Sequence, residues 1–260
     1  MRYKSTRGQV SDLSFTEAVL MGLASDGGLL LPESVPDVSE HLEAWQSLSY
    51  PELAKNIMGL YIGDIAAAEL SGIIDKSYST FTNEKVTPLN RMGETNILEL
   101  FHGPTLAFKD VALQFLGNVF EHILKETKGE LNIVGATSGD TGSAAIAGVR
   151  GKDNINIFIM FPEGKTSELQ ELQMTSVLDA NVHNLAVDGS FDDCQALLKS
   201  VFSDLPFKAQ YQLGAVNSVN WARILAQIVY FFSAYFQLKE EQPQTHKVDF
   251  CVPTGNFGDI

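Results

Sequence analysis

The chain has 260 residues, of which 45% are hydrophobic and 19% are charged. Those fractions are ordinary for a globular protein, and the length suits one large domain or two to three smaller ones. The formal net charge of −14 and the lack of a basic stripe disfavour nucleic acids and anionic membranes as partners. No apolar run is long enough to cross a bilayer, and the first residues lack the apolar core of a signal peptide. We therefore expect a cytoplasmic protein.

Residues 1–88 favour a helical domain. Ser14 precedes an apolar helical pattern and is followed by Glu17, the spacing of a capping box. Ser49 precedes a second helical pattern that continues to Leu60. This part of the chain has no cluster of titratable residues, which favours a scaffold or a contact surface over a catalytic role.

From residue 97 onward, strand-like and helix-like patterns alternate. We expect strands at 96–101, 131–134, 155–161, 182–187 and 248–252, and helices at 110–124, from 143, at 190–202 and at 219–238. This alternation implies a mostly parallel sheet with right-handed crossovers. The two cysteines, Cys194 and Cys251, favour buried free thiols over a disulfide, and two cysteines alone make no zinc site.

Lys109 lies between an apolar flank (Leu106, Ala107 and Phe108) and the start of a helical pattern. Such a flank tends to remove water from the amine, which favours its neutral form. A neutral lysine amine is a nucleophile that forms a Schiff base with an aldehyde cofactor or a carbonyl substrate. The ordinary alternative is a surface lysine near a helix start. Asp110, the next residue, suits the N-cap of that helix.

Glycine-rich turns follow two of the expected strands. Residues 135–143 (GATSGDTGS) separate the strand-like run 131–134 from a helix-like run of small residues. A strand, a turn and a helix in this order point backbone N–H groups and a helix N-terminus at an anion. Residues 254–259 (TGNFGD) can cradle a phosphate in the same way. Neither segment matches the phosphate-loop or dinucleotide pattern, so a nucleotide is disfavoured as the ligand.

A lysine and two anion-type turns suit pyridoxal 5′-phosphate (PLP), which needs an amine for its aldehyde and a nest for its phosphate. An amino-acid substrate needs a second nest for its carboxylate. Residues 102–110 (HGPTLAFKD), 136–145 (ATSGDTGSAA) and 253–259 (PTGNFGD) resemble, in that order, the motifs of threonine synthases. Those are PLP enzymes of the tryptophan-synthase-β fold type. The similarity runs from about residue 3 to the last residue.

The resemblance implies an α/β protein of PLP fold type II, with mostly parallel sheets, flanking helices and a helical N-terminal domain. We expect that helical domain at 1–88, a large cofactor-binding α/β domain at 89–128 and 206–260, and a small α/β domain with the substrate loop at 129–205. Threonine synthases continue beyond this length. The cofactor domain is therefore expected to be incomplete at its C-terminus and to lack the partner of the PLP ring nitrogen. A monomer and a dimer both remain open.

The resemblance also implies roles for particular residues. Lys109 would bind PLP and carry protons during the reaction. The PLP phosphate would lie on Gly255, Asn256, Phe257, Gly258 and Asp259. The substrate carboxylate would lie on Thr137, Ser138, Gly139, Asp140 and Thr141, with Asp140 also a candidate for the PLP ring hydroxyl. The candidates for the substrate's own phosphate are Lys165, Ser167, Asn220 and Arg223. A solvated lysine and a helix-end arginine are the ordinary alternatives for Lys165 and Arg223.

The implied reaction converts O-phospho-L-homoserine and water to L-threonine and phosphate, the last step of threonine biosynthesis. It proceeds by β,γ-elimination and addition of water at Cβ, with PLP as electron sink. Two alternatives remain open: a PLP-dependent phospho-lyase that releases a 2-oxo acid, and a non-catalytic PLP-binding fragment. No metal is expected.

Overall fold

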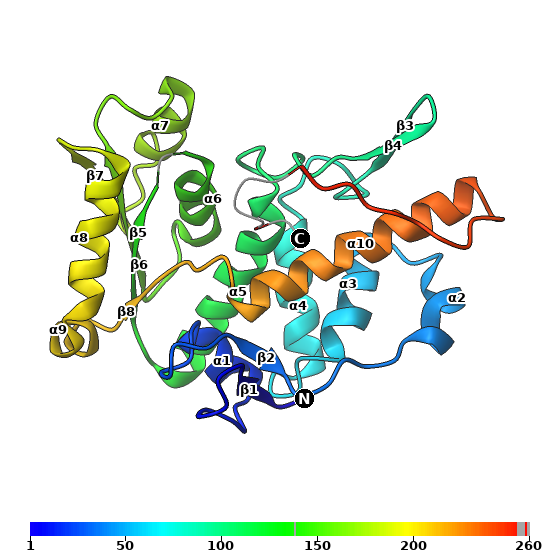
Figure 1. The fold of residues 1–260 in the computed structure, drawn as a ribbon, viewed down its shortest axis with the longest axis horizontal. Coiled ribbons are helices and arrows are strands. Elements are labelled where there is room, and N and C mark those ends of the chain that lie inside the picture. The colour runs from blue at the N-terminus through cyan, green and yellow to red at the C-terminus, as the bar shows by residue number, and fades with distance from the viewer. Residues whose placement is uncertain (138, 254–257, 259–260) are drawn as a thin grey trace. The chain divides into compact units, whose positions relative to one another are not determined.

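The computed structural model describes residues 1–137, 139–253 and 258 (Figure 1). The chain divides into two compact units, Met1–Phe115 with Ser218–Ile260 and Leu116–Asn217. The boundary falls within one long helix, α5 (Lys109–Thr127). The three-part division expected from the sequence remains a prediction. Among the described residues, no helix is both long enough and apolar enough to cross a membrane.

The first unit is mostly helical and contains short antiparallel strand pairs. Its helices are α1 (Phe15–Met21), the 3-10 helix η1 (Ser39–His41), α2 (Leu42–Trp45), α3 (Tyr50–Gly59), α4 (Ala67–Tyr78), the start of α5, and α10 (Trp221–Glu241). Its strand pairs are β1 (Tyr3–Ser5) with β2 (Leu30–Pro32), and β3 (Leu89–Met92) with β4 (Thr95–Leu98).

Helices α1 and α3 both begin at capping boxes, of which the sequence predicted the one at Ser14 and only a helix start at Ser49. The carboxylate of Glu17 accepts a hydrogen bond of 2.8 Å from the backbone N–H of Ser14. The carboxylate of Glu52 accepts one of 2.9 Å from the backbone N–H of Ser49. Each serine hydroxyl in turn accepts from the backbone of its glutamate. These bonds satisfy N–H groups that lack a helical partner, and both predicted helix starts are confirmed.

Helix α10 forms the centre of the first unit's core. It packs against α3 and α1, and the Trp221 ring in its first turn lies 6.2 Å from the Tyr3 ring and 5.6 Å from the Tyr61 ring, measured between centroids. The side-chain amide of Asn220 donates a bond of 2.8 Å to the carbonyl of Val19, 201 residues earlier in the chain. Burial of each large side chain here contributes about 1.5–3 kcal/mol to folding.

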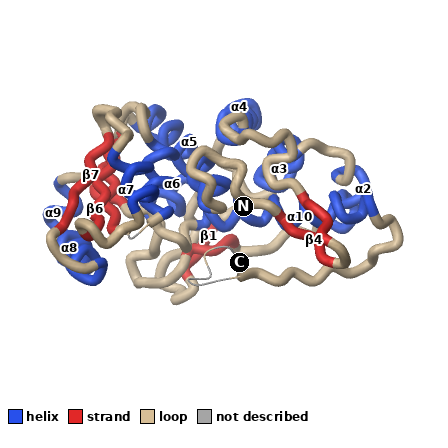
Figure 2. The backbone as a smooth tube through the Cα atoms, turned by 90° about the horizontal axis from the view of Figure 1, so that it is seen from above, coloured by secondary structure: helices blue, strands red, loops and turns tan. Residues whose placement is uncertain are grey.

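The predicted strand at 96–101 is present but belongs to a hairpin. β3 and β4 pair antiparallel, with Leu89 opposite Leu98, whereas the alternating pattern had indicated a parallel sheet. The hairpin lies beside α10 (Figure 2). The Leu89 N–H donates a bond of 3.0 Å to the Gln237 side chain of that helix.

The predicted strand at 248–252 is wrong. This segment has no regular secondary structure, because no described strand pairs with it. Its Phe250 ring instead packs edge-on against Phe231 of α10, with 4.9 Å between centroids. Cys251 is exposed, so only Cys194 matches the expectation of buried free thiols.

The second unit is built on a parallel sheet with the order β7-β6-β5-β8. Its strands are β5 (Leu131–Ala136), β6 (Ile155–Pro162), β7 (Val182–Val187) and β8 (Leu213–Gly214), and its helices are the end of α5, α6 (Asp140–Val149), α7 (Glu168–Thr175), α8 (Phe191–Ser203) and α9 (Leu205–Gln210). The predicted strands at 131–134, 155–161 and 182–187 are thus confirmed, and the helix expected from 143 begins at 140.

Helices cover both faces of this sheet. α6 and α8 both contact β6, and Figure 1 shows them on opposite sides of the strands. β6 is accordingly mostly buried, as its continuous apolar sequence predicts. Where α5 passes α6, Gly117 faces Gly148 so closely that a methyl group at Gly117 would lie 2.7 Å from the Gly148 carbonyl carbon.

Candidate functional site

Lys109 is the first residue of α5, and the loop before it is tied to the helix's first turn. The buried carboxylate of Asp110 accepts bonds of 2.8 Å and 2.7 Å from the backbone N–H and hydroxyl of Thr105. Gly103 packs directly on the Asp110 side chain. The prediction that Asp110 is the helix N-cap is therefore wrong. Its carboxylate lies within the helix and fastens the loop that leads to Lys109.

The same loop contains a backbone conformation that branched residues avoid. Leu106 has φ of +60° in the left-handed region, and its side chain is 67% exposed. Neither the exposure of this leucine side chain nor its positive φ is energetically favourable. Such conformations persist only where the surrounding structure imposes them. The turn at Leu106 brings the chain into α5 just before Lys109.

The Phe108 ring lies close to both Lys109 and Gly258. The Lys109 Nζ atom is 4.7 Å from the centroid of the Phe108 ring. A methyl group at Gly258 would lie 3.8 Å from the Cζ atom of the same ring, an ordinary van der Waals distance. The lysine and Gly258 are thus neighbours of one aromatic ring. Gly255, Asn256, Phe257 and Asp259, the other predicted phosphate-loop residues, lie outside the described residues.

Helix α10 fixes Gly258 through a polar residue on its buried face. The Gln227 amide donates a bond of 2.8 Å to the Gly258 carbonyl and one of 3.1 Å to the Tyr230 hydroxyl. Gln227 is only 5% exposed. Gln227 was not among the residues predicted from the sequence. A glutamine four positions after Arg223, on the apolar face of a long helix, is the signal that would have identified it.

The turn after β5 is organised around Thr137. Its hydroxyl donates a bond of 3.0 Å to the Gly139 carbonyl and accepts bonds of 3.1 Å from the N–H groups of Gly139 and Gly142. Thr137 is 3% exposed, so its hydroxyl shapes the turn from inside. The turn leads into α6 at Asp140 and Thr141, both half-buried. Ser138 lies outside the described residues.

The four candidates for the substrate's phosphate occupy two places. Lys165 and Ser167 belong to the second unit, where Lys165 is exposed and Ser167 caps α7. The positive charge of Lys165 helps to hold the pKa of Asp193 below its ordinary value, after the larger effect of hydrogen bonds from Ser190. Asn220 and Arg223 belong to the first unit.

Asn220 and Arg223 have different environments. Both polar ends of the Asn220 side chain are engaged, because its oxygen accepts from the N–H of Ala222 and its amide donates to Val19. Arg223 is 1% exposed, and its Nε atom makes no hydrogen bond within the described structure. Burial lowers the pKa of its guanidinium to about 10. A buried cation whose Nε atom has no hydrogen-bond partner in the described part of the chain is costly, which marks Arg223 as a candidate anion ligand.

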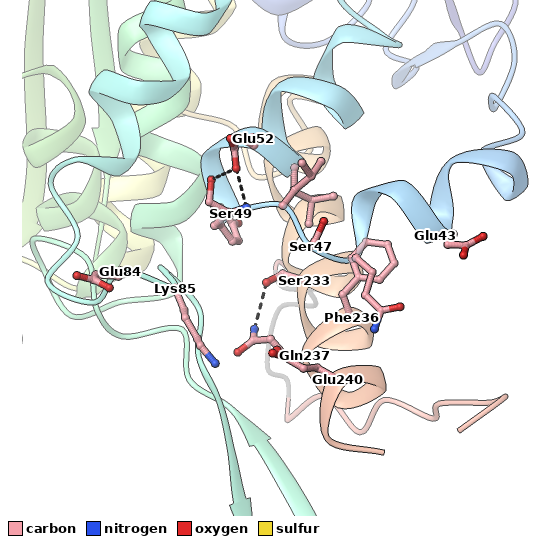
Figure 3. Close-up of a pocket in the computed structure, with 14 residues that line it drawn as sticks. Glu43, Ser47, Ser49, Glu52, Glu84, Lys85, Ser233, Phe236, Gln237 and Glu240 are labelled. Carbon is pink, nitrogen blue, oxygen red and sulfur yellow. Dashed lines mark hydrogen bonds between the residues drawn. The ribbon is translucent and has the colours of Figure 1, made fainter. Parts of the chain in front are cut away.

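A cavity of about 740 Å³ lies elsewhere in the first unit (Figure 3). Glu43, Glu52, Glu84 and Glu240 line it, together with Lys85. None of these is a predicted site residue. Glu52 already receives the hydrogen bonds of the α3 capping box. We assign this cavity no ligand.

Comparison with known families gives matches along almost the whole chain. A model described as "Threonine synthase N terminus" matches residues 2–78, and one described as "Pyridoxal-phosphate dependent enzyme" matches residues 82–260. Threonine synthase of Schizosaccharomyces pombe is 53% identical over 99% of this chain and 52% of its own length. That of Pseudomonas aeruginosa is 51% identical over 100% of this chain and 55% of its own length.

Solved structures give the same picture. PLP-bound threonine synthase from Brucella melitensis superposes with a TM-score of 0.94 at 46% identity, covering 100% of this chain and 56% of that one. Threonine synthase from yeast superposes with a TM-score of 0.93 at 49% identity, covering 99% and 54%. The chain thus spans about half the length of the relatives that it matches.

Proposed function

The chain belongs to the family of pyridoxal-phosphate dependent enzymes, and from that premise we propose that it acts as a threonine synthase. The substrate would be O-phospho-L-homoserine, and the products L-threonine and phosphate. Support comes from the name shared by its relatives at 50–53% identity and from the match of residues 2–78 to the threonine synthase N terminus. The structural observation that carries the proposal is the placing of Lys109 and Gly258 against the Phe108 ring.

The residues present fit PLP and an anionic substrate. Lys109 supplies an amine at a helix start, beside an aromatic side chain. Gly258 lets the backbone approach a phosphate closely, and Gln227 holds its carbonyl. The buried Nε atom of Arg223 has no hydrogen-bond partner in the described structure and can donate to an anion. These groups match the aldehyde and the phosphates that the cofactor and the substrate would bring.

PLP, when bound, supplies an electron sink for negative charge next to the carbon that carries the amino group. Lys109 would hold the cofactor's aldehyde carbon and afterwards move protons at Cα and Cβ of the substrate. The turn from Thr137 to Thr141 would bind the substrate's carboxylate through backbone N–H groups and the N-terminus of α6. Arg223 and Lys165 would bind its phosphate.

The overall charge of −14 opposes an anionic substrate, so the attraction must be local. The N-terminus of α6 carries about half a positive charge from its aligned peptide dipoles. Arg223 adds a full charge in surroundings from which water is excluded. The same net charge supports our inference that the protein works without nucleic acid, and we infer a cytoplasmic location.

The first test is the absorption spectrum of the purified chain with PLP, followed by borohydride reduction and peptide mapping. We expect visible absorption and a reduced label on Lys109. Labelling of another lysine instead, such as the exposed Lys125 on the same helix, would contradict the assignment of Lys109.

The second test supplies O-phospho-L-homoserine and analyses the products. We expect L-threonine and inorganic phosphate in equal amounts. Release of a 2-oxo acid in place of threonine would replace the proposed reaction with that of a phospho-lyase. Bound PLP without any turnover would leave a non-catalytic PLP-binding protein.

A further inference from the structure

Helix α7 packs against the turn that we propose for the substrate's carboxylate, and the inference drawn from this contact rests on that proposed function. Gln170 and Met174 lie one helical turn apart on α7. A methyl group at Gly139 would lie 2.9 Å from both Nε2 and Oε1 of Gln170. One at Gly142 would lie 2.6 Å from the Met174 sulfur. One face of α7 therefore covers Gly139, the N-cap of α6, and Gly142 in the first turn of that helix.

With Gln170 in this conformation, the contact leaves no room for a side chain at residue 139. Gly139 has φ of 176°, an extended conformation that any residue adopts. Backbone freedom therefore does not require a glycine here. The Gln170 amide occupies the space that a side chain at residue 139 would need.

The Gln170 side chain is itself fixed. The hydroxyl of Ser167, the N-cap of α7, donates a bond of 2.9 Å to its Oε1 atom. At the other end of the helix, the Asn184 amide of β7 donates a bond of 2.9 Å to the Met174 carbonyl. Met174 is fully buried. The bond from Asn184 thus ties the C-terminal end of α7 to β7, while the Ser167 hydroxyl orients the Gln170 side chain on the helix itself.

We propose that Gln170 is a positioning residue. Its amide, oriented by Ser167, holds Gly139 and the start of α6 in the conformation that receives the substrate's carboxylate. The hydroxyl of Thr137 shapes this turn from inside, and Gln170 supports it from outside. Without the amide, the turn has room to relax, and its N–H groups no longer converge on one anion.

The role in shape is tested by hydrogen exchange, which needs no activity. In Gln170→Ala, peptides covering 137–142 should exchange about fivefold faster, while those covering β6 stay unchanged. The control is Leu169→Ala, because Leu169 lies on the same helix and is 71% exposed. Unaltered exchange of the turn in Gln170→Ala would overturn the proposal, whatever the enzyme does.

The role in binding is tested by kinetics of the PLP-loaded full chain. Gln170→Ala should raise KM for the phosphorylated substrate about tenfold, with kcat and PLP affinity nearly unchanged. Gln170→Met, which keeps the volume, should restore part of the loss. Gln170→Glu should raise KM further, because it places a negative charge beside the carboxylate. An unchanged KM in Gln170→Ala, or a parallel loss of PLP affinity and thermal stability, would refute a positioning role.

The two readouts separate the two proposals. A wild-type chain that produces no threonine would defeat the proposed function, and the exchange measurement would still decide whether Gln170 holds the turn. An active wild type whose Gln170→Ala variant binds and exchanges normally would defeat this inference alone.

Discussion

The side-chain amide of Gln227 donates a hydrogen bond of 2.8 Å to the carbonyl oxygen of Gly258. The bond joins the buried face of α10 to a motif whose other residues carry the predicted contacts to the cofactor phosphate. Both partners lie in the first unit, where Phe108 also borders Gly258. A single helix glutamine therefore fixes the position of a backbone carbonyl in the motif that we propose for the cofactor phosphate.

Gln227→Ala should weaken PLP binding. Loss of one buried hydrogen bond costs about 0.5–1.5 kcal/mol, which raises the dissociation constant up to about tenfold. The measurement is a titration of the visible absorption with PLP. Gln237→Ala is the matched control, because Gln237 is also a glutamine of α10 but bonds the loop at Thr87. Equal PLP affinities in both variants would count against the role of Gln227.

Lys109→Ala should abolish the visible absorption of bound PLP and lower turnover by at least about a thousandfold, because we propose that its amine is both the anchor of the cofactor and the proton carrier. Circular dichroism should show an unchanged fold. Lys125→Ala removes an exposed lysine from the same helix and should keep both properties. Residual wild-type absorption in Lys109→Ala would show that another amine holds the cofactor.

Arg223→Met should weaken binding of the substrate without lowering the stability of the fold. Burial of a guanidinium whose Nε atom lacks a hydrogen bond in the described structure is costly, so an apolar replacement of similar length should leave the free energy of unfolding unchanged or raise it by about 1–4 kcal/mol. KM for the phosphorylated substrate should nevertheless rise, because the charge that attracts its phosphate is lost. Urea unfolding and steady-state kinetics measure the two effects. A large loss of stability without a change in KM would assign Arg223 to the scaffold.

Alkaline pH gives a second test of Arg223. Its folded pKa, about 10, lies below its ordinary value of 12.5. The unfolded chain therefore binds more protons between these values, and this group makes the protein more stable as the pH rises through 10. Arg223→Met should lack that contribution. Identical pH dependence of unfolding in the two proteins above pH 9.5 would contradict the burial of the charge.

Gly117→Ala should destabilise the second unit, because the added methyl group would press into the carbonyl of Gly148. Overpacking of this kind costs about 1–3 kcal/mol. Gly72→Ala is the opposite case: Gly72 lies within α4, and a methyl group there meets nothing within 4 Å. Alanine should stabilise that helix by about 0.5–1 kcal/mol. Urea unfolding that ranks the two variants in the reverse order would refute the close α5–α6 approach.

Acid should reduce the stability that the serine-capped helix starts contribute. Hydrogen bonds from the cap serines lower the pKa of Glu17, Glu52 and Asp193 below their ordinary values. Their contribution to stability is complete above the ordinary pKa, 4.5 for Glu and 3.8 for Asp, and is lost as the pH falls through the lower folded values. Unfolding measured from pH 6 to pH 3 should show this loss, and Glu52→Gln should reduce it. A pH dependence unaltered by Glu52→Gln would exclude this cap as a cause.

The sequence predicted those features that short stretches of chain determine. The box of Ser14 with Glu17 specifies a helix start, because donor and acceptor lie three residues apart. The apolar run at 155–161 specifies a strand covered on both faces, and β6 is that strand. Lys109 at a helix start follows from the same kind of local pattern.

Contacts between distant residues were not predictable in this way. Gln170 meets Gly139 only because β6 and its connection return α7 to the turn, and nothing near either residue signals the meeting. The segment 248–252 has the apolar pattern of a strand, but a strand also needs a neighbour, and the described residues offer it none. The role of Gln227 was not predictable, because a single polar residue on an apolar helix face can have many different hydrogen-bond partners.

The bond from Asn220 to Val19 has a consequence for the order in which the protein is made. α1 leaves the ribosome early, yet the Asn220 amide that bonds to Val19 is synthesised 201 residues after its partner. The Trp221 ring that packs on Tyr3 follows immediately after Asn220. At about 5–20 residues per second, that interval is about 10–40 s. Throughout this interval, Tyr3 and α1 lack the contacts that Trp221 and Asn220 later provide. A nascent chain stalled before residue 220 should therefore be a preferred client of hydrophobic-binding chaperones.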